Sequence, residues 1–252
     1  GSPALDAGDD LSCPPADQRG EPRPQGMACD VGAFESTPAD LCSVQTEIPE
    51  SECQALEDFY VSTNGDSWTD NTDWLVTYTP CSWFGVTCDA GHVTWLNLPG
   101  NDLTGVLPAS LVDLSELRSL ALNVNQLTGG IPSIYGSFSE LRTLMLWNNE
   151  LSGNIPPELG NLNNAAHLSL GMNNLSGTIP PQLGNLANLW RLELNVNQLS
   201  GPIPIELTNL TNLEELGLGN NQLSGTIPEE LDNLVNLTLL SLEHNQLSGN
   251  IP

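Results

Sequence analysis

Residues 141–186 read LRTLMLWNNELSGNIPPELGNLNNAAHLSLGMNNLSGTIPPQLGNL and decide the fold. They hold two copies of a 24-residue template, LxxLxLxxNxLxGxIPxxLxxL, which recurs from Val93 to the end of the chain without an insertion. Its three fixed columns are Asn101, Asn125, Asn149, Asn173, Asn197, Asn221 and Asn245; Gly105, Gly129, Gly153, Gly177, Gly201, Gly225 and Gly249; and Leu98, Leu122, Leu146, Leu170, Leu194, Leu218 and Leu242. Seven starts in one register indicate a solenoid of stacked repeats.

Each part of the template has a physical role. The LxxLxLxxN segment predicts a short strand whose leucines point inward while alternate residues point outward. The column Asn turns the chain after the strand, and its amide pairs with backbone groups inside the turn. The Gly permits backbone angles closed to other residues, and Ile-Pro starts an extended return path. The sequence therefore predicts a strand-dominated solenoid of the α/β type.

The template resembles the plant-specific subclass of leucine-rich repeats, whose signature is LSGxIPxxLGNL. Gly153–Leu162 (GNIPPELGNL) and Gly177–Leu186 (GTIPPQLGNL) match it closely. This subclass occurs in plant receptor kinases, polygalacturonase-inhibiting proteins and bacterial surface proteins, and here we expect the bacterial surface variety. The resemblance implies a right-handed superhelix over residues 93–252, with seven repeats of which the last is truncated. It does not identify a ligand.

Residues 48–92 resemble the N-terminal cap of that family, which covers the exposed end of a solenoid core. Glu50–Ser62 has helical spacing of Leu56, Phe59 and Tyr60 and predicts a helix. The segment CSWFGVTC, from Cys81 to Cys88, contains the WxGVxC pattern of the cap. Family caps usually carry two adjacent cysteines before that Trp, whereas only Cys81 precedes it here.

Residues 1–36 show no repeat and resemble the C-terminal end of a bacterial parallel β-helix surface protein. The matching segments are Ser2–Gly8, Asp17–Gly20 and Cys29–Glu35. The alternative is a linker stapled by a disulfide. Residues 37–47 are expected to be a linker between this tail and the cap.

Six cysteines lie within the first 88 residues: Cys13, Cys29, Cys42, Cys53, Cys81 and Cys88. An even number in loop-rich sequence predicts disulfides and an oxidising compartment, so we expect a secreted or cell-surface protein. Six cysteines allow 15 pairings. With the cap resemblance in view, we favour sequential pairing: the first with the second, the third with the fourth, and the fifth with the sixth.

The charge is strongly negative, with 31 Asp and Glu against 5 Arg and no Lys, for a net charge of −26. Such a surface repels nucleic acid and anionic lipid, so neither is an expected partner. No apolar stretch has the length of a membrane span, and no membrane insertion is expected.

A search for chemistry predicts no enzyme, no cofactor and no metal site. The sequence has no phosphate loop, no GxSxG and no HExxH. His92, His167 and His244 are spread over the chain and are expected to be solvated. Asp66, Asp70 and Asp73 do not fit the spacing of a calcium loop and are expected in turns.

The outward positions of LxxLxLxxN predict a concave binding face, because they collect the Arg and Trp residues of the repeats. The candidate ligand-binding residues are Trp95, Arg118, Arg142, Met145, Trp147, His167, Trp190, Arg191, Glu193 and Glu215. Trp and Arg often carry binding energy. The expected ligand is a protein, a peptide or a glycan, including one with acidic groups. The alternative is that Arg191 pairs with Glu215 and the aromatic residues merely cover the sheet.

Three functions compete at this point. The first is a non-catalytic extracellular recognition module that binds its ligand on the concave face. The second is an acidic spacer or adhesive stalk of a cell-surface protein. The third is a non-catalytic tail of a β-helix carbohydrate-active enzyme. A concave face with clustered aromatic residues and unexpected charge favours recognition, and a bland face favours the spacer.

Overall fold

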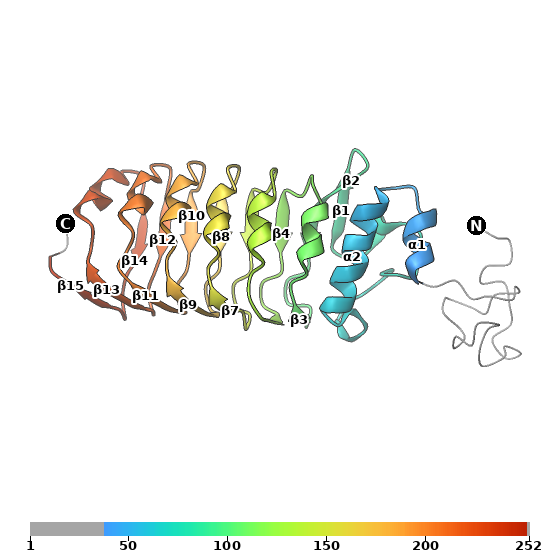
Figure 1. Cartoon of the computed structure of the whole chain (residues 1–252), viewed down its shortest axis with the longest axis horizontal. Helices are drawn as coiled ribbons and strands as arrows, with labels where there is room; N and C mark the ends of the chain where they lie inside the picture. The colour runs from blue at the N-terminus through green and yellow to red at the C-terminus, as the bar shows by residue number, and fades with distance from the viewer. Residues whose placement is uncertain (1–37, 251–252) are drawn as a thin grey trace, which may run out of the picture.

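A computed structural model describes residues 38–250, which form an elongated array of stacked repeats behind a helical cap (Figure 1). The fold is the strand-dominated solenoid with a disulfide-bonded helical cap that the sequence predicts. Residues 1–36, with the β-helix resemblance and the cysteines Cys13 and Cys29, lie outside the described range.

An eight-stranded sheet runs the length of the array. Its strands, in spatial order, are β1 (Val86–Asp89), β2 (His92–Asn97), β4 (Ser119–Ala121), β6 (Thr143–Met145), β8 (His167–Ser169), β10 (Arg191–Glu193), β12 (Glu215–Gly217) and β14 (Leu239–Ser241). Only β1 and β2 are antiparallel; the other pairs are parallel. Thr143 pairs with His167, and His167 pairs with Arg191, so one full template separates neighbours. The template leucines Leu144, Leu168 and Leu192 are buried.

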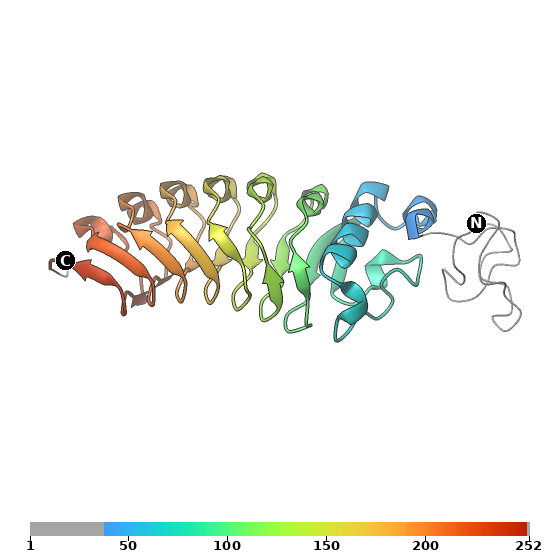
Figure 2. The same cartoon turned by 60° about the horizontal axis from the view of Figure 1, so that its bottom comes forward.

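Each repeat also contains a second short strand, and the first six contain a 3₁₀ helix, which the template did not lead us to expect. The second strands are β3 (Thr104–Val106) with β5 (Gln126–Thr128), and β7 (Ser152–Asn154), β9 (Asn174–Thr178), β11 (Gln198–Gly201), β13 (Gln222–Thr226) and β15 (Gln246–Ser248). The helices are η4 (Ala109–Asp113), η5 (Ser133–Ser137), η6 (Pro157–Asn161), η7 (Pro181–Asn185), η8 (Ile205–Asn209) and η9 (Glu229–Asn233). The array curves gently with these helices on the outer side of the arc (Figure 2).

The column asparagines hold the turns together as expected. The side-chain amide of Asn173 donates to the carbonyl oxygens of Leu146, Leu170 and Gly171 at 3.0–3.1 Å. Its side-chain oxygen accepts from the backbone N–H of Leu151 at 3.0 Å. One buried side chain therefore satisfies backbone groups in two consecutive repeats, which stabilises their stacking.

The cap is built around a cluster of aromatic side chains. Its elements are α1 (Pro38–Val44), α2 (Glu50–Ser62), η2 (Gly65–Ser67) and η3 (Pro80–Ser82). The predicted helix thus has the expected bounds. Phe59 and Tyr60 from α2 pack against Trp68 and Trp74, and Trp74 packs against Trp83, with ring centroids 5.0–6.2 Å apart. Trp83, the tryptophan of the WxGVxC motif, is therefore a core residue.

Two disulfides fasten the described part of the cap. Cys42 pairs with Cys53, and Cys81 pairs with Cys88. These are two of the three pairs favoured from the sequence. The stretch 37–47, expected as a linker, contains α1, and the first disulfide ties this helix to α2. Its described part therefore belongs structurally to the cap.

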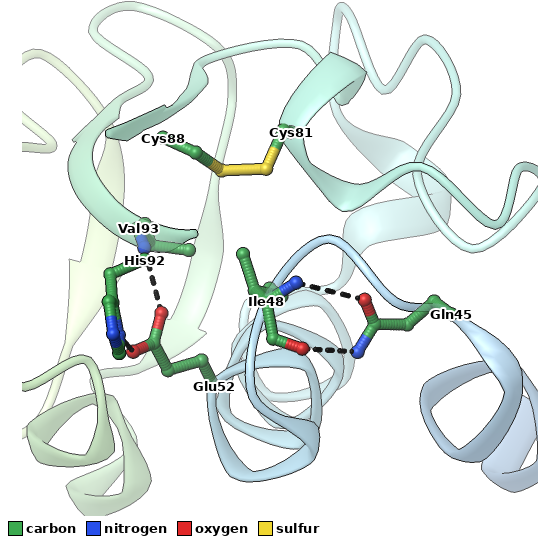
Figure 3. A network of polar contacts seen from close by, with 7 residues as sticks. All are labelled: Gln45, Ile48, Glu52, Cys81, Cys88, His92 and Val93. Atoms are coloured by element: carbon green, nitrogen blue, oxygen red, sulfur yellow. Dashed lines mark hydrogen bonds and ion pairs between the residues drawn. A yellow bond between two sulfur atoms is a disulfide. The ribbon is translucent and has the colours of Figure 1, made fainter. Parts of the chain in front are cut away.

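A polar network joins the cap to the first strand of the repeats (Figure 3). Glu52 is buried, and its carboxylate accepts from the backbone N–H of Val93 at 2.7 Å and lies 2.6 Å from Nδ1 of His92. Gln45 bonds the backbone N–H and carbonyl of Ile48 at 3.2 and 2.8 Å. His92 is therefore paired with a carboxylate, while its side chain remains 39% exposed to solvent as expected.

Candidate ligand-binding face

We call the outward side of the eight-stranded sheet, between β2 and β14, the concave face. The sequence assigned five positions of every repeat to it, but several of these hold buried residues. Ala121 and Ser169 are buried because their small side chains lie below the level of their neighbours. The larger candidates remain accessible: Trp95 is 50% exposed and Trp190 is 37% exposed.

The two arginines near the first repeats differ in their surroundings. Arg118 forms an ion pair with Asp89 at 3.2 Å. Arg142 lies beside it, because the Arg142 backbone N–H donates to the Arg118 carbonyl. Arg142 is exposed and forms no ion pair with any residue in the range 38–250. It is therefore a cation left available on the concave face.

A hollow of about 390 Å³ opens in the middle of this face. Its floor is made by Ser169 and Gly171 of the β8 repeat. The preceding repeat has Met145 and Trp147 at the same template positions, and the following repeat has larger polar residues there. Two small residues between two rows of large ones create the hollow. Comparing the residues at these two template positions in successive repeats predicts the hollow, whereas the sequence of a single repeat does not.

Four charged or ionisable side chains contact one another at the hollow: His167, Arg191 and Glu193 line it, and Glu215 lies next to Arg191 outside it. Arg191 donates from Nη2 to Glu193 at 2.9 Å, and its Nε lies 2.9 Å from Glu215. Nε2 of His167 lies 3.4 Å from the other oxygen of Glu193. The predicted alternative pairing of Arg191 with Glu215 is therefore present in the structure. It leaves two carboxylates for one guanidinium.

The neighbours of Glu193 keep it ionised. The hydrogen bond with His167 contributes most to lowering the pKa of Glu193 to about 2, and Ser169 and the charge of Arg191 add to it. Partial burial acts in the opposite direction. A carboxylate so stabilised remains negative throughout the physiological range.

Trp190 extends the cluster around His167. Its ring lies 5.6 Å from the imidazole of His167, and the Arg191 guanidinium lies 6.0 Å from the indole centroid. The histidine is thus held between an indole and a carboxylate. The expectation that His167 is a solvated surface histidine is wrong.

One edge of the face carries a row of apolar residues whose backbone strain the sequence did not indicate. Val124, Met172 and Val196 have positive φ angles of 61°, 53° and 57°, and all three side chains are exposed. Asn148 and Asn220 occupy the same column, and asparagine tolerates this conformation well. An exposed β-branched residue in the left-handed region reduces stability, and it provides an apolar contact on the face.

The acidic residues of the cap serve the fold. Asp70 accepts from the backbone N–H and the hydroxyl of Thr72 at 3.0 and 2.7 Å, and Asp66 accepts from the hydroxyl of Tyr60. Among residues 38–250, no group of three or more His, Cys, Asp or Glu side chains has the arrangement of a metal site.

The sequence matches the Leucine Rich Repeat family model at residues 140–162, 164–186 and 212–234. The structure of Pollen Receptor Kinase 3 is 33% identical and has a TM-score of 0.67, over 77% of this chain and 95% of that chain. The chain is a leucine-rich repeat protein of the plant type.

Two further relatives match parts of this leucine-rich repeat protein. A plant peptide hormone receptor, RGFR1, solved in complex with RGF2, is 43% identical with a TM-score of 0.61, over 61% of this chain and 25% of that chain. A probable inactive receptor kinase from Arabidopsis thaliana, RLK902, is 48% identical over 46 residues. This match covers 18% of the present chain and 7% of the relative.

The leucine-rich repeat protein is secreted or exposed at the cell surface, like the ectodomains it resembles, and its disulfides fit that compartment. None of the helices between residues 38 and 250 combines the length and the hydropathy of a membrane-spanning segment.

Proposed function

We propose that the chain is a non-catalytic extracellular recognition module that binds an extended peptide along its concave face. The observation that carries the proposal is the composition of this face in a protein of net charge −26. An available cation, Arg142, and the exposed indole of Trp190 lie on the same face as a hollow at the centre of the sheet. Residues of these types supply much of the binding energy of known interfaces.

A peptide suits the geometry of this surface. The hollow and the exposed side chains follow one another across neighbouring parallel strands, so an extended chain crossing the strands meets them in turn. The similarity to a receptor described as a plant peptide hormone receptor supports the same class of ligand. A glycan, which would stack its sugar rings on Trp190 and Trp95, is the competing ligand class.

The other two functions fit the face less well. A spacer has no use for exposed valines in a strained conformation or for two carboxylates paired with one arginine. A tail of a carbohydrate-active enzyme would bind glycan, so the choice of ligand separates it from peptide recognition.

The test is a selection of a phage-displayed random peptide library on the immobilised protein, beside an array of plant and bacterial glycans. We expect enriched peptides whose affinity falls at least about tenfold on Arg142→Ala or Trp190→Ala. Glu158→Ala, an exposed change on η6 at the outer side, is the matched control and should leave affinity unchanged. Binders that tolerate both concave changes and are lost on the outer-side change would refute the proposal, and glycan binding alone would replace peptide by glycan.

A further inference from the structure

The central hollow has two unlike walls. The wall nearer the N-terminus is apolar and polarisable, with Met145 and Trp147, and Met172 lies at its edge. The wall nearer the C-terminus carries Arg191, Glu193 and Asn195, and His167 also lines the hollow. The floor between them, Ser169 and Gly171, has almost no side-chain bulk. The hollow is therefore shaped for one side chain that is apolar along its length and polar at its end.

The charge balance at the second wall is negative. Arg191 is shared between Glu193 and Glu215, and the exposed Glu214 directly precedes Glu215 in the sequence. The low pKa of Glu193 keeps its charge in place. Arg142, the nearest other cation on the face, belongs to the repeat of β6, two strands away from β10, and does not line the hollow. The cluster therefore has an excess of carboxylate that a cation from outside would offset.

Asn195 adds a primary amide to the lining of the hollow. A Cβ added to Gly171 would lie 2.9 Å from the side-chain oxygen of Asn195, and one added to Gly217 would lie 3.2 Å from it. The Asn195 amide therefore spans the space between the two glycines. No side-chain hydrogen bond of Asn195 with another residue of the range 38–250 is present in the structure. A primary amide in this position offers one acceptor and two donors to a peptide group.

We infer that the hollow receives a lysine or arginine side chain of the bound peptide, with its stem against Trp147 and its charge beside Glu193. This inference rests on the proposed function and names the residue class that the hollow selects. The aliphatic stem gains burial against the thioethers and the indole, and the cation also interacts with the π face of the indole. The net charge of −26 attracts a basic segment over a longer range.

The experiment begins with the peptides selected on the parent protein. We expect the enriched peptides to share a basic residue at one fixed position. Replacing that residue by norleucine keeps the stem and removes the charge. On the parent protein, the norleucine peptide should bind at least about tenfold more weakly than the basic peptide. On the Glu193→Gln variant, which lacks the charge partner, the two peptides should differ by less than about threefold. Since the change is made in the peptide, the fold of the protein is not affected.

A second variant tests the hollow itself. Ser169→Leu fills the floor and should weaken the same peptides, whereas Ser241→Leu, at the equivalent position of β14, should not. Peptides that are lost on Trp190→Ala but carry no fixed basic residue, or that tolerate norleucine or Ser169→Leu, would overturn this inference and leave the proposed function standing. An absence of concave-face binders would overturn the proposed function, and the inference with it.

Discussion

The imidazole of His92 and the carboxylate of Glu52 meet 2.6 Å apart, where helix α2 of the cap abuts the first strand of the repeats (Figure 3). The carboxylate is buried, and its second oxygen accepts from the backbone N–H of Val93. The pair therefore links the charge state of a partly exposed histidine to the attachment of the cap.

This pair predicts a pH-dependent stability. The hydrogen bond to Glu52 raises the pKa of His92 above its ordinary value. A raised pKa means that the protonated histidine stabilises the fold below about pH 6.5 and that this contribution is lost as the pH rises through the higher folded value. His92→Ala should therefore destabilise the protein more at about pH 5 than at about pH 9, as measured by urea unfolding. An equal loss at both pH values would contradict the prediction.

Glu193 predicts the opposite dependence in acid. Its pKa is lowered to about 2, so its contribution is present above the unfolded value of about 4.5 and is lost as the pH falls through about 2. Glu193→Gln should cost roughly 1–3 kcal/mol of unfolding free energy at neutral pH, and the cost should shrink toward pH 2. Glu206→Gln, an exposed change on η8, provides the comparison and should cost less than about 0.5 kcal/mol at neutral pH.

Asn173 should matter more for folding than an exposed charge. Asn173→Ala removes an amide and an oxygen that together satisfy four backbone groups, and we expect it to cost about 1–3 kcal/mol of unfolding free energy. Glu158→Ala on the exposed side of η6 should cost less than about 0.5 kcal/mol. Thermal unfolding of the two variants checks this, and equal melting temperatures would show that the asparagine column is dispensable.

Val196 should separate stability from binding. It has a φ of 57°, and the same column holds Asn148 and Asn220. Val196→Asn should therefore stabilise the protein by about 0.5–1 kcal/mol while weakening peptides selected on the concave face. Val235→Asn changes an exposed valine without a positive φ and should alter stability by less than about 0.5 kcal/mol. A destabilised Val196→Asn protein would show that the strain at this position is negligible.

The parts of the fold that repeat were predictable because every repeat solves the same burial problem. The first sheet, the asparagine bonds and helix α2 follow from columns of one residue type or from helical spacing. The second sheet was missed because strands such as Ser152–Asn154 show no hydrophobic alternation. Helix α1 was missed because a stretch of seven residues carries too little periodic signal.

The candidate site was predictable only as a surface. Template positions place Trp190 and Arg142 on the same face, because outward positions of stacked strands share one side. The pairing of Glu52 with His92 links positions in different elements, and nothing local to either residue indicates it. The hollow depends on what Ser169 and Gly171 lack, so it emerges only when neighbouring repeats are compared side by side.

Paired residues on neighbouring strands are always one repeat apart in the sequence, and this has a consequence for how such a protein evolves. The hollow is assembled from three consecutive repeats, those of β6, β8 and β10. Duplicating a whole repeat elsewhere in the array would lengthen the protein and leave this site intact. Duplicating the β8 repeat would move Trp147 away from Glu193 and replace one hollow by a wider trough. Gain or loss of a repeat within the hollow therefore changes the binding specificity. Gain or loss of a repeat elsewhere in the array changes only the length of the molecule.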